Sequence, residues 1–334
     1  MSAEEHLDIG HTVDVSVDAN EAGELVSIFQ AKIYFTDRGV MSLDINAVSW
    51  ASPYINQNRK GAFPKTVADV LKTGDVALFE LLEDGKLRLA QVPDIQGALI
   101  SIDPQDGAIT ALSGGFNFYD ETKNGNFNRA MDAGRQPGSA FKPFIYSAAL
   151  ERGFTVASII NDAPIVEQSS ELETFWRPEN YSGEINGPTR LREALIKSLN
   201  LVSIRLLRSP DLATGISHTV EHLKRFGFDQ IALPRNNTLA LGSGSVAPLD
   251  VAQGYATFAN GGYSVIPYII ETIEDENGKV LYRADPNLAC SDCINNEDMN
   301  AELIETSSDL YSSAQHTDRT ISAQNAYLIN DLLQ

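Results

Sequence analysis

A serine and a lysine three residues apart, Ser139 and Lys142, form the strongest chemical signal in the sequence. Pro137-Gly138 predicts a turn that brings Ser139 to the start of a helix over residues 139–150, where positions i and i+3 share one face. A serine hydroxyl becomes a nucleophile when a base takes its proton, and a lysine with a lowered pKa can be that base. The pair therefore has the chemistry for acyl transfer through a covalent serine intermediate. Taken alone, however, so short a motif is more often a helix cap beside a surface lysine.

Longer motifs around this pair carry a resemblance to a known family. They are Arg135-Gln-Pro-Gly-Ser-Ala-Phe-Lys-Pro-Phe-Ile-Tyr146, Trp176-Arg-Pro-Glu-Asn180, Gly187-Pro-Thr-Arg-Leu-Arg-Glu-Ala-Leu-Ile-Lys-Ser-Leu-Asn200 and the run from Ala240 to Gly262. Together they resemble the transpeptidase domain of the class A, bifunctional penicillin-binding proteins over about residues 96–334. The resemblance implies an α/β (α+β) serine transpeptidase, or β-lactamase-like, domain.

The resemblance assigns roles to four residues. Ser139 is implied to be the acylated nucleophile, which attacks the D-Ala-D-Ala carbonyl of a peptidoglycan stem peptide, and Lys142 its general base. Ser198 and Asn200 match the second family motif, in which the serine relays a proton towards the leaving group and the asparagine holds the substrate amide. Ser139 and Asn200 would thus contact substrate. β-Lactams would acylate the same serine as substrate mimics, and no cofactor or metal is implied.

The third family motif, Lys-Thr/Ser-Gly, is where this sequence departs from the pattern. Its only match, Lys72-Thr73-Gly74, precedes Ser139, whereas in the family the motif follows the other two. We interpret this match as a loop and expect the true motif beyond Gln334. The transpeptidase domain is then incomplete at its C-terminus, and we expect the chain by itself to be inactive or weakly acylated.

Other functions remain as alternatives. His218-Thr-Val-Glu-His222 fits the pattern of inverted zinc proteases, but it lies in an ordinary amphipathic helix without an obvious third ligand. A Ser-His-Asp triad lacks a Gly-x-Ser-x-Gly elbow around any candidate serine. Within the same fold, the alternatives are a serine β-lactamase or a penicillin sensor. A non-catalytic docking platform for cell-wall synthesis partners is the remaining one.

Composition limits the partners. The chain has 334 residues, which predicts two folded units and three at most. Its 45 acidic and 25 basic residues give a formal net charge of -20, which argues against nucleic acid or anionic lipid as the main partner.

No stretch of about 18 apolar residues could span a bilayer, and the start does not look like a signal peptide. We therefore expect the membrane anchor, and the glycosyltransferase domain that the resemblance implies, to lie outside this chain. The resemblance implies that the full-length protein acts at the periplasmic face of the inner membrane.

The elements that must position the site fall into two regions. Residues 1–96 predict a small all-β barrel or sandwich, from short apolar runs separated by turns such as Asp84-Gly85. This module resembles the OB-like domain of the family, which implies a docking site for an outer-membrane activator protein. A spacer without a partner is the alternative. Residues 97–334 form the predicted transpeptidase domain.

Within the second region, residues 98–103 and 108–112 predict a hairpin with apolar residues on both faces, which we expect inside a sheet covered by helices. Periodicity predicts helices over residues 139–150, 189–207, 219–226, 249–259 and 322–333. Residues 271–318 hold 12 acidic and 2 basic residues, which is typical of a solvated or flexible insert. This insert contains Cys290 and Cys293, either a disulfide or two idle thiols.

Overall fold

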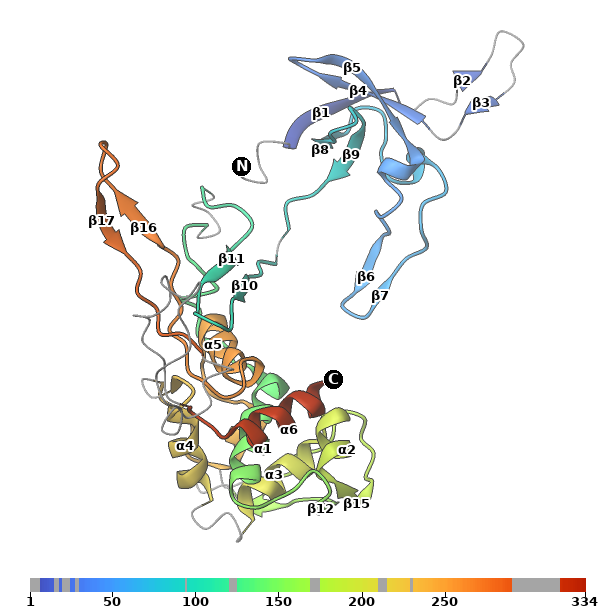
Figure 1. Cartoon of the computed structure of the whole chain (residues 1–334). Helices are drawn as coiled ribbons and strands as arrows, with labels where there is room; N and C mark the ends of the chain where they lie inside the picture. The colour runs from blue at the N-terminus through green and yellow to red at the C-terminus, as the bar shows by residue number, and fades with distance from the viewer. Residues whose placement is uncertain are drawn as a thin grey trace. The chain divides into compact units, whose positions relative to one another are not determined.

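The computed structural model describes residues 30–93, 95–119, 125–168, 175–209, 215–228, 231–289 and 319–334, together with the backbone of strands between residues 7 and 27. The chain divides into two compact units (Figure 1). The first comprises Met1–Gln96 and Phe116–Asn126, and the second comprises Gly97–Gly115 and Phe127–Gln334. Each unit has its own hydrophobic core.

The first unit is built on a five-stranded antiparallel sheet of order β5-β4-β1-β8-β9. Its strands are β1 Leu7–Asp14, β4 Gln30–Phe35, β5 Gly39–Asp44, β8 Val76–Leu81 and β9 Leu87–Ala90. Shorter pairs join β2 Asp18–Ala19 to β3 Leu25–Ser27 and β6 Tyr54–Asn56 to β7 Arg59–Lys60, and the 3-10 helices are η2 Ile45–Ala47 and η3 Val67–Asp69. The predicted all-β module is confirmed.

Alternation along the strands explains the core of the first unit. In β4, Ala31, Ile33 and Phe35 are buried and the residues between them are exposed. This is the pattern of a strand with one face against a core and the other in water. Phe35 meets Phe79 of β8 edge to face, with ring centroids 6.0 Å apart, an arrangement that aromatic pairs favour.

Two glycine turns flank β8. Asp84-Gly85 forms the predicted hairpin turn, in which Leu81 pairs with Leu87 and Gly85 has a φ of 78°. Lys72-Thr73-Gly74 lies in the turn before β8, where the Asp75 N–H donates to the Lys72 carbonyl at 3.0 Å. The early Lys-Thr-Gly match is therefore a turn of the β unit, as the sequence indicated.

The second unit combines helices with small antiparallel strand pairs, in agreement with the predicted α/β (α+β) class. Its helices are α1 Lys142–Glu151, α2 Leu191–Ile196, α3 Asn200–Arg208, α4 Ile216–Lys224, α5 Pro248–Ala259 and α6 Ala323–Leu333, with the 3-10 helices η5 Gly138–Phe141 and η7 Asn237–Leu241. Its strand pairs are β10 Leu99–Ile102 with β11 Ile109–Ser113, β12 Ile159–Asp162 with β15 Gly187–Arg190, β13 Glu167–Gln168 with β14 Phe175–Trp176, and β16 Thr272–Glu274 with β17 Val280–Arg283.

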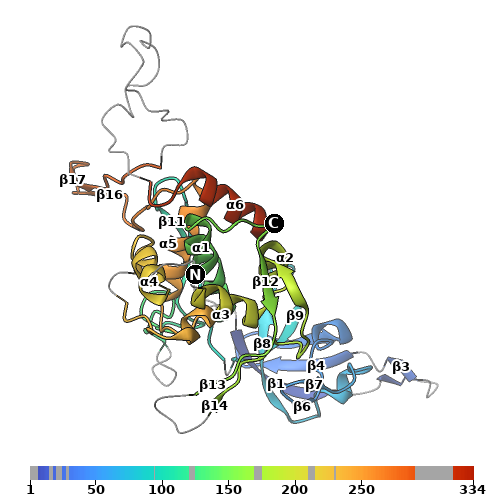
Figure 2. The same ribbon diagram turned by 90° about the horizontal axis from the view of Figure 1, so that it is seen from below.

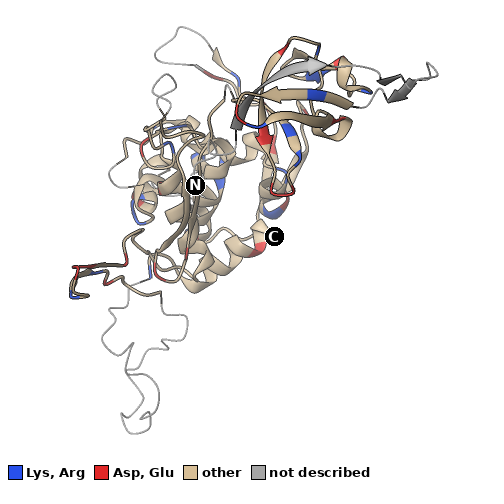
Figure 3. Ribbon diagram, turned by 90° about the horizontal axis from the view of Figure 1, so that it is seen from above, with Lys and Arg blue, Asp and Glu red and all other residues tan. Residues whose placement is uncertain are grey.

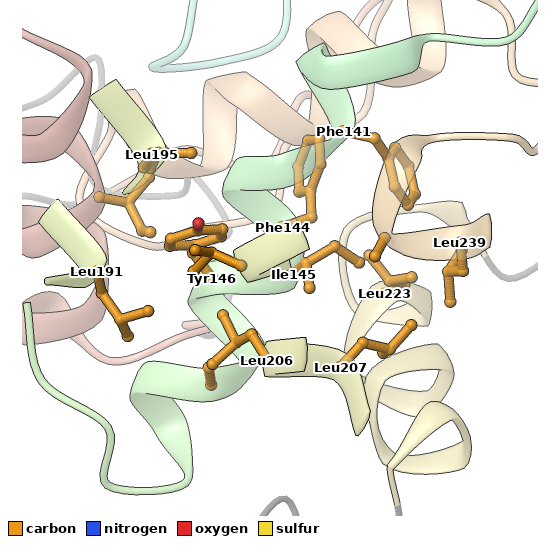
Figure 4. Close-up of a cluster of buried hydrophobic side chains, with 14 of the residues drawn as sticks. Phe141, Phe144, Ile145, Tyr146, Leu191, Leu195, Leu206, Leu207, Leu223 and Leu239 are labelled. Atoms are coloured by element: carbon orange, nitrogen blue, oxygen red, sulfur yellow. The ribbon is translucent and has the colours of Figure 1, made fainter. Parts of the chain in front are cut away.

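Helix α1 forms the centre of the second unit, among α3, α4, α5 and α6 (Figure 2). Every residue from Lys142 to Ala149 is buried, as expected of a helix enclosed on all sides. The ring centroids of Phe226, Phe228 and Phe258 lie 5.1–5.2 Å from that of Phe144. Leucines of the neighbouring elements complete this cluster (Figure 4). The core thus fixes the first turn of α1, where the predicted catalytic lysine lies.

The single helix predicted over residues 189–207 is wrong. The chain forms α2 and α3 instead, and between them Ser198 has a φ of 53°. A residue with a Cβ pays about 1 kcal/mol to adopt this left-handed conformation. A tertiary contact holds it there, because the Ser198 carbonyl accepts a hydrogen bond from Lys142 Nζ at 2.6 Å. Helical periodicity continues through the break, so it could not reveal the corner.

One hairpin differs from the sequence-based expectation and a second agrees with it. β10 and β11 pair as predicted, but among the described residues they form a two-stranded sheet, with α5 beside β10 and Leu99 58% exposed. The expected larger sheet covered by helices is therefore not found there. In the acidic insert, β16 and β17 form a hairpin whose strand residues are all exposed, as a solvated insert requires. Cys290 and Cys293 lie outside the described residues.

We predict that Ser198→Gly is more stable than Ser198→Ala by about 1 kcal/mol, because glycine adopts a positive φ without a Cβ penalty. Both variants lose the hydroxyl, so the comparison isolates the backbone. The measurement is the free energy of unfolding by urea.

The matched control is Glu221 in α4, an exposed helical position where both replacements lose the contact with Lys224. There the glycine variant should be less stable than the alanine variant by about 1 kcal/mol. The same sign at both positions would contradict a strained Ser198.

Candidate active site

Ser139 lies in η5, the 3-10 turn that leads directly into α1. Two contacts from α5 and the loop before it hold the turn: the Gly138 N–H donates to the Gly242 carbonyl at 3.2 Å, and the Tyr255 hydroxyl donates to the Ala140 carbonyl at 2.8 Å. A Cβ at Gly242 would lie 2.1 Å from the Gly138 carbonyl oxygen, so this approach requires glycine. Ser139 itself is exposed, which an external substrate requires of a nucleophile.

Lys142, the first residue of α1, is completely buried. Its Nζ donates to the Ser198 carbonyl at 2.6 Å, to Ser198 Oγ at 3.0 Å and to Asn200 Oδ1 at 2.8 Å. Three acceptors match the three N–H groups of an ammonium ion. The lysine is therefore held in one position by the corner between α2 and α3.

Burial lowers the pKa of Lys142 from 10.5 to about 8, because removal from water disfavours the charged form. At pH 7 about one Lys142 in ten is then neutral, against about one in 3,000 at the ordinary pKa. Only the neutral amine has a lone pair that can take a proton. The site thus meets the electrostatic requirement for a general base near neutral pH.

The corner between α2 and α3 presents Ser198 and Asn200 to the lysine. The left-handed conformation of Ser198 directs its carbonyl to Lys142, and Asn200 begins α3. Asn200 Nδ2 donates to the Glu179 carbonyl at 2.9 Å. This bond fixes the amide so that Oδ1, the acceptor, faces the lysine. The structure thus joins three of the four predicted site residues by hydrogen bonds and places Ser139 one turn before Lys142.

The histidines of the zinc-protease pattern are engaged within the protein. His222 Nε2 lies 3.0 Å from Ser147 Oγ and its Nδ1 lies 2.8 Å from Glu151 Oε2, while both ring nitrogens of His218 contact Arg152. Ser147 is fully buried, so this array offers no nucleophile to a substrate. In the described part of the chain, no group of three or more His, Cys, Asp or Glu residues could hold a metal ion.

Charges of both signs are interspersed over each unit (Figure 3). Basic residues pair with nearby acids, as in the contacts of Arg88 with Glu80 and of Arg225 with Glu151.

Sequence reasoning missed two supports of the site, Asn180 and Tyr255. Asn180 Oδ1 accepts the Asn200 N–H at 2.8 Å, and the Tyr255 hydroxyl holds the turn around Ser139. Both residues lie in runs that carried the family resemblance, Trp176–Asn180 and 240–262. Their place in these runs could have indicated a role in the site. Because they are far from Ser139 and Lys142 in the sequence, only the folded structure shows that they lie close to it.

Two family matches define the class of protein to which this fold and site belong. Residues 97–334 match the penicillin-binding protein transpeptidase domain, and residues 25–95 match the penicillin-binding protein OB-like domain. This chain therefore belongs to the penicillin-binding protein transpeptidase family and has an OB-like domain before the transpeptidase domain. The predicted family and fold class are confirmed.

Within that family, the chain is similar to penicillin-binding protein 1A of Gram-negative bacteria. It is 50% identical over 241 residues to that of Pseudomonas aeruginosa, which covers 72% of this chain and 28% of the relative. It is 42% identical over 264 residues to that of Escherichia coli K12, which covers 79% and 30%. A crystal structure of penicillin-binding protein 1A from Haemophilus influenzae matches with a TM-score of 0.75 and 32% identity, covering 100% of this chain and 45% of the other.

The chain spans about a third of the length of these two curated relatives, with 28% and 30% of each covered. The described residues include no helix long and apolar enough to cross a membrane.

We predict that the Lys142 side chain titrates with a midpoint near pH 8. The measurement is NMR of the chain with ¹³C-labelled lysine, and the resonance is assigned by its loss in Lys142→Arg. A midpoint near the ordinary 10.5 would contradict the burial of this amine.

Proposed function

We propose that the second unit is a serine-type D-Ala-D-Ala transpeptidase that cross-links peptidoglycan stem peptides, as part of a bifunctional peptidoglycan synthase. The observation that carries this proposal is the buried Lys142, three residues after the exposed Ser139 and hydrogen-bonded to Ser198 and Asn200. Membership of the transpeptidase family supports it, because such a domain implies binding of peptides and β-lactams.

In the proposed acylation step, neutral Lys142 takes the proton of the Ser139 hydroxyl. The Ser139 Oγ attacks the carbonyl between the two terminal D-alanines, a Ser139–acyl bond forms, and the peptide C–N bond breaks. The proton reaches the leaving amine through Lys142 and Ser198 Oγ, which lie 3.0 Å apart. Asn200 Nδ2 carries a second hydrogen besides the one bonded to Glu179, and this hydrogen can hold the substrate amide.

In the second step, an amine from a neighbouring stem peptide attacks the Ser139 ester. The new peptide bond forms, the Ser139–acyl bond breaks, and the amine proton returns to Ser139 through the same lysine. A β-lactam stops after acylation, because its ring opens and its amine stays attached to the acyl group. Attack of water on the Ser139 ester formed from the β-lactam would instead release the opened drug, which is the β-lactamase alternative.

The proposal for the first unit is coarser. An OB-like domain beside a transpeptidase can dock a partner, and by resemblance to the family we propose an outer-membrane activator protein that binds residues 1–96. The same resemblance supports action of the full-length protein at the periplasmic face of the inner membrane. A docking platform without catalysis would retain activator binding but would not react with penicillin.

We predict that the full-length protein is labelled by fluorescent penicillin and that Ser139→Ala abolishes labelling, because the nucleophile is removed. The measurement is gel fluorescence per amount of protein. Ser217→Ala, an exposed serine of α4 in the same unit, is the matched control and should label normally. Retained labelling of Ser139→Ala would refute the nucleophile assignment.

We also predict that the acylation rate depends on pH through Lys142. Protonated lysine cannot act as the base, so the rate should rise by about tenfold per pH unit below pH 8 and level off above it. Stopped-flow acylation of the full-length protein between pH 6 and 9.5 measures this pH dependence. A rate independent of pH would assign the base elsewhere.

A further inference from the structure

A buried carboxylate lies behind the candidate active site, at the end of β12. Asp162 has no exposed surface. Its oxygens accept from Asn180 Nδ2 at 2.9 and 3.0 Å, from the Asn186 N–H at 2.8 Å and from Asn186 Nδ2 at 2.7 Å. Burial raises the pKa of Asp162, but the hydrogen bonds from Asn186 and Asn180 outweigh it and leave the pKa below its ordinary value. Asp162 is thus a charged acceptor that offers no hydrogen.

This carboxylate decides which end of the Asn180 amide faces α3. Asn180 Nδ2 donates to Asp162 and to the Glu184 carbonyl at 2.9 Å, so Oδ1 points the other way. There Oδ1 accepts the N–H groups of Asn200 at 2.8 Å and of Leu201 at 3.2 Å. The N-cap residue of α3 makes no side-chain capping bond of its own. The first turn of α3 is therefore capped by a side chain twenty positions upstream.

The capped end of α3 is also the part that meets Lys142. Asn180 holds the backbone of Asn200, and the carbonyl of the adjacent Glu179 holds its side chain. With both fixed, Asn200 Oδ1 lies 2.8 Å from Lys142 Nζ. One short segment, residues 179–180, thus connects the buried Asp162 to the amine.

We propose that Asp162 and Asn180 are positioning residues that hold the corner from Ser198 to Asn200 against Lys142. Asp162 acts through Asn180, and Asn180 acts through Asn200, so neither contacts a reacting atom. Their effect on the acylation rate rests on the proposed function, whereas their effect on the titration midpoint of Lys142 does not. The charge matters because an acceptor that cannot donate allows only one orientation of the Asn180 amide.

Asn180→Asp tests the direction of the hydrogen bond. It keeps an oxygen for α3 but sets two carboxylates against each other without a hydrogen between them. We expect the acylation rate of the full-length protein at pH 8 to fall by about tenfold, which as a free energy lies within the cost of one unsatisfied buried polar group. Because one carboxyl of the pair takes up a proton on acidification and can then donate, the ratio of variant to wild-type rate should rise between pH 8 and pH 6. A ratio constant over this range would overturn the proposal.

The double variant Asp162→Asn with Asn180→Asp restores one donor opposite one carboxylate, with the polarity reversed. We expect the double variant to recover at least half of the decrease in log rate that Asn180→Asp causes. If the decreases in log rate of Asn180→Asp and Asp162→Asn simply add in the double variant, the proposal is overturned. Ser322→Ala is the matched control, because it removes the side-chain N-cap of α6 in the same unit. It should lower stability without changing the acylation rate.

The Lys142 titration separates this proposal from the proposed function. In Asn180→Ala the ammonium should lose the fixed Asn200 acceptor, so the NMR midpoint should fall below the wild-type value. An unchanged midpoint would overturn the positioning role even if penicillin labels the protein. A lowered midpoint, together with a full-length protein that penicillin does not label, would instead refute the transpeptidase function and leave the positioning role intact.

Discussion

The Lys142 amine is enclosed without exposed surface, and its hydrogen bonds must all be made inside the protein. Ser198 and Asn200 supply the three acceptors. A buried polar group without partners costs more than most single contacts contribute, so the surrounding chain must deliver these acceptors accurately. The same burial lowers the pKa of Lys142 to about 8. One constraint therefore governs both the local conformation and the basicity on which the proposed chemistry depends.

The conformations around the lysine follow from this requirement. Ser198 adopts an unfavourable left-handed φ because its carbonyl then reaches Lys142, and the helix predicted across it breaks into α2 and α3. The aromatic cluster around Phe144 fixes α1, the helix that carries Lys142, and the Tyr255 hydroxyl holds the turn that carries Ser139. Packing energy from the core thus maintains the strained corner, as is common where backbone strain serves a site.

The sequence predicted much of the molecule because several of its signals are local. Alternation along β4 and the Asp84-Gly85 turn each depend on neighbouring residues. Family resemblance added the candidate site, from Ser139 to Asn200. The corner at Ser198 was missed, because apolar periodicity does not report backbone dihedral angles. The hairpin of β10 and β11 was placed in a larger sheet, because apolar strands predict burial without naming the partner.

By itself, the sequence determined the order of the two domains, the family, and the residue types that acyl transfer needs. These are set by composition, spacing and motif, which are properties of the chain before it folds. The tertiary structure decided that Lys142 is buried with a pKa of about 8. It also decided that Asn180 bonds to both Asp162 and Asn200. Desolvation and hydrogen bonds between distant segments exist only after the chain packs, so no local pattern could supply them.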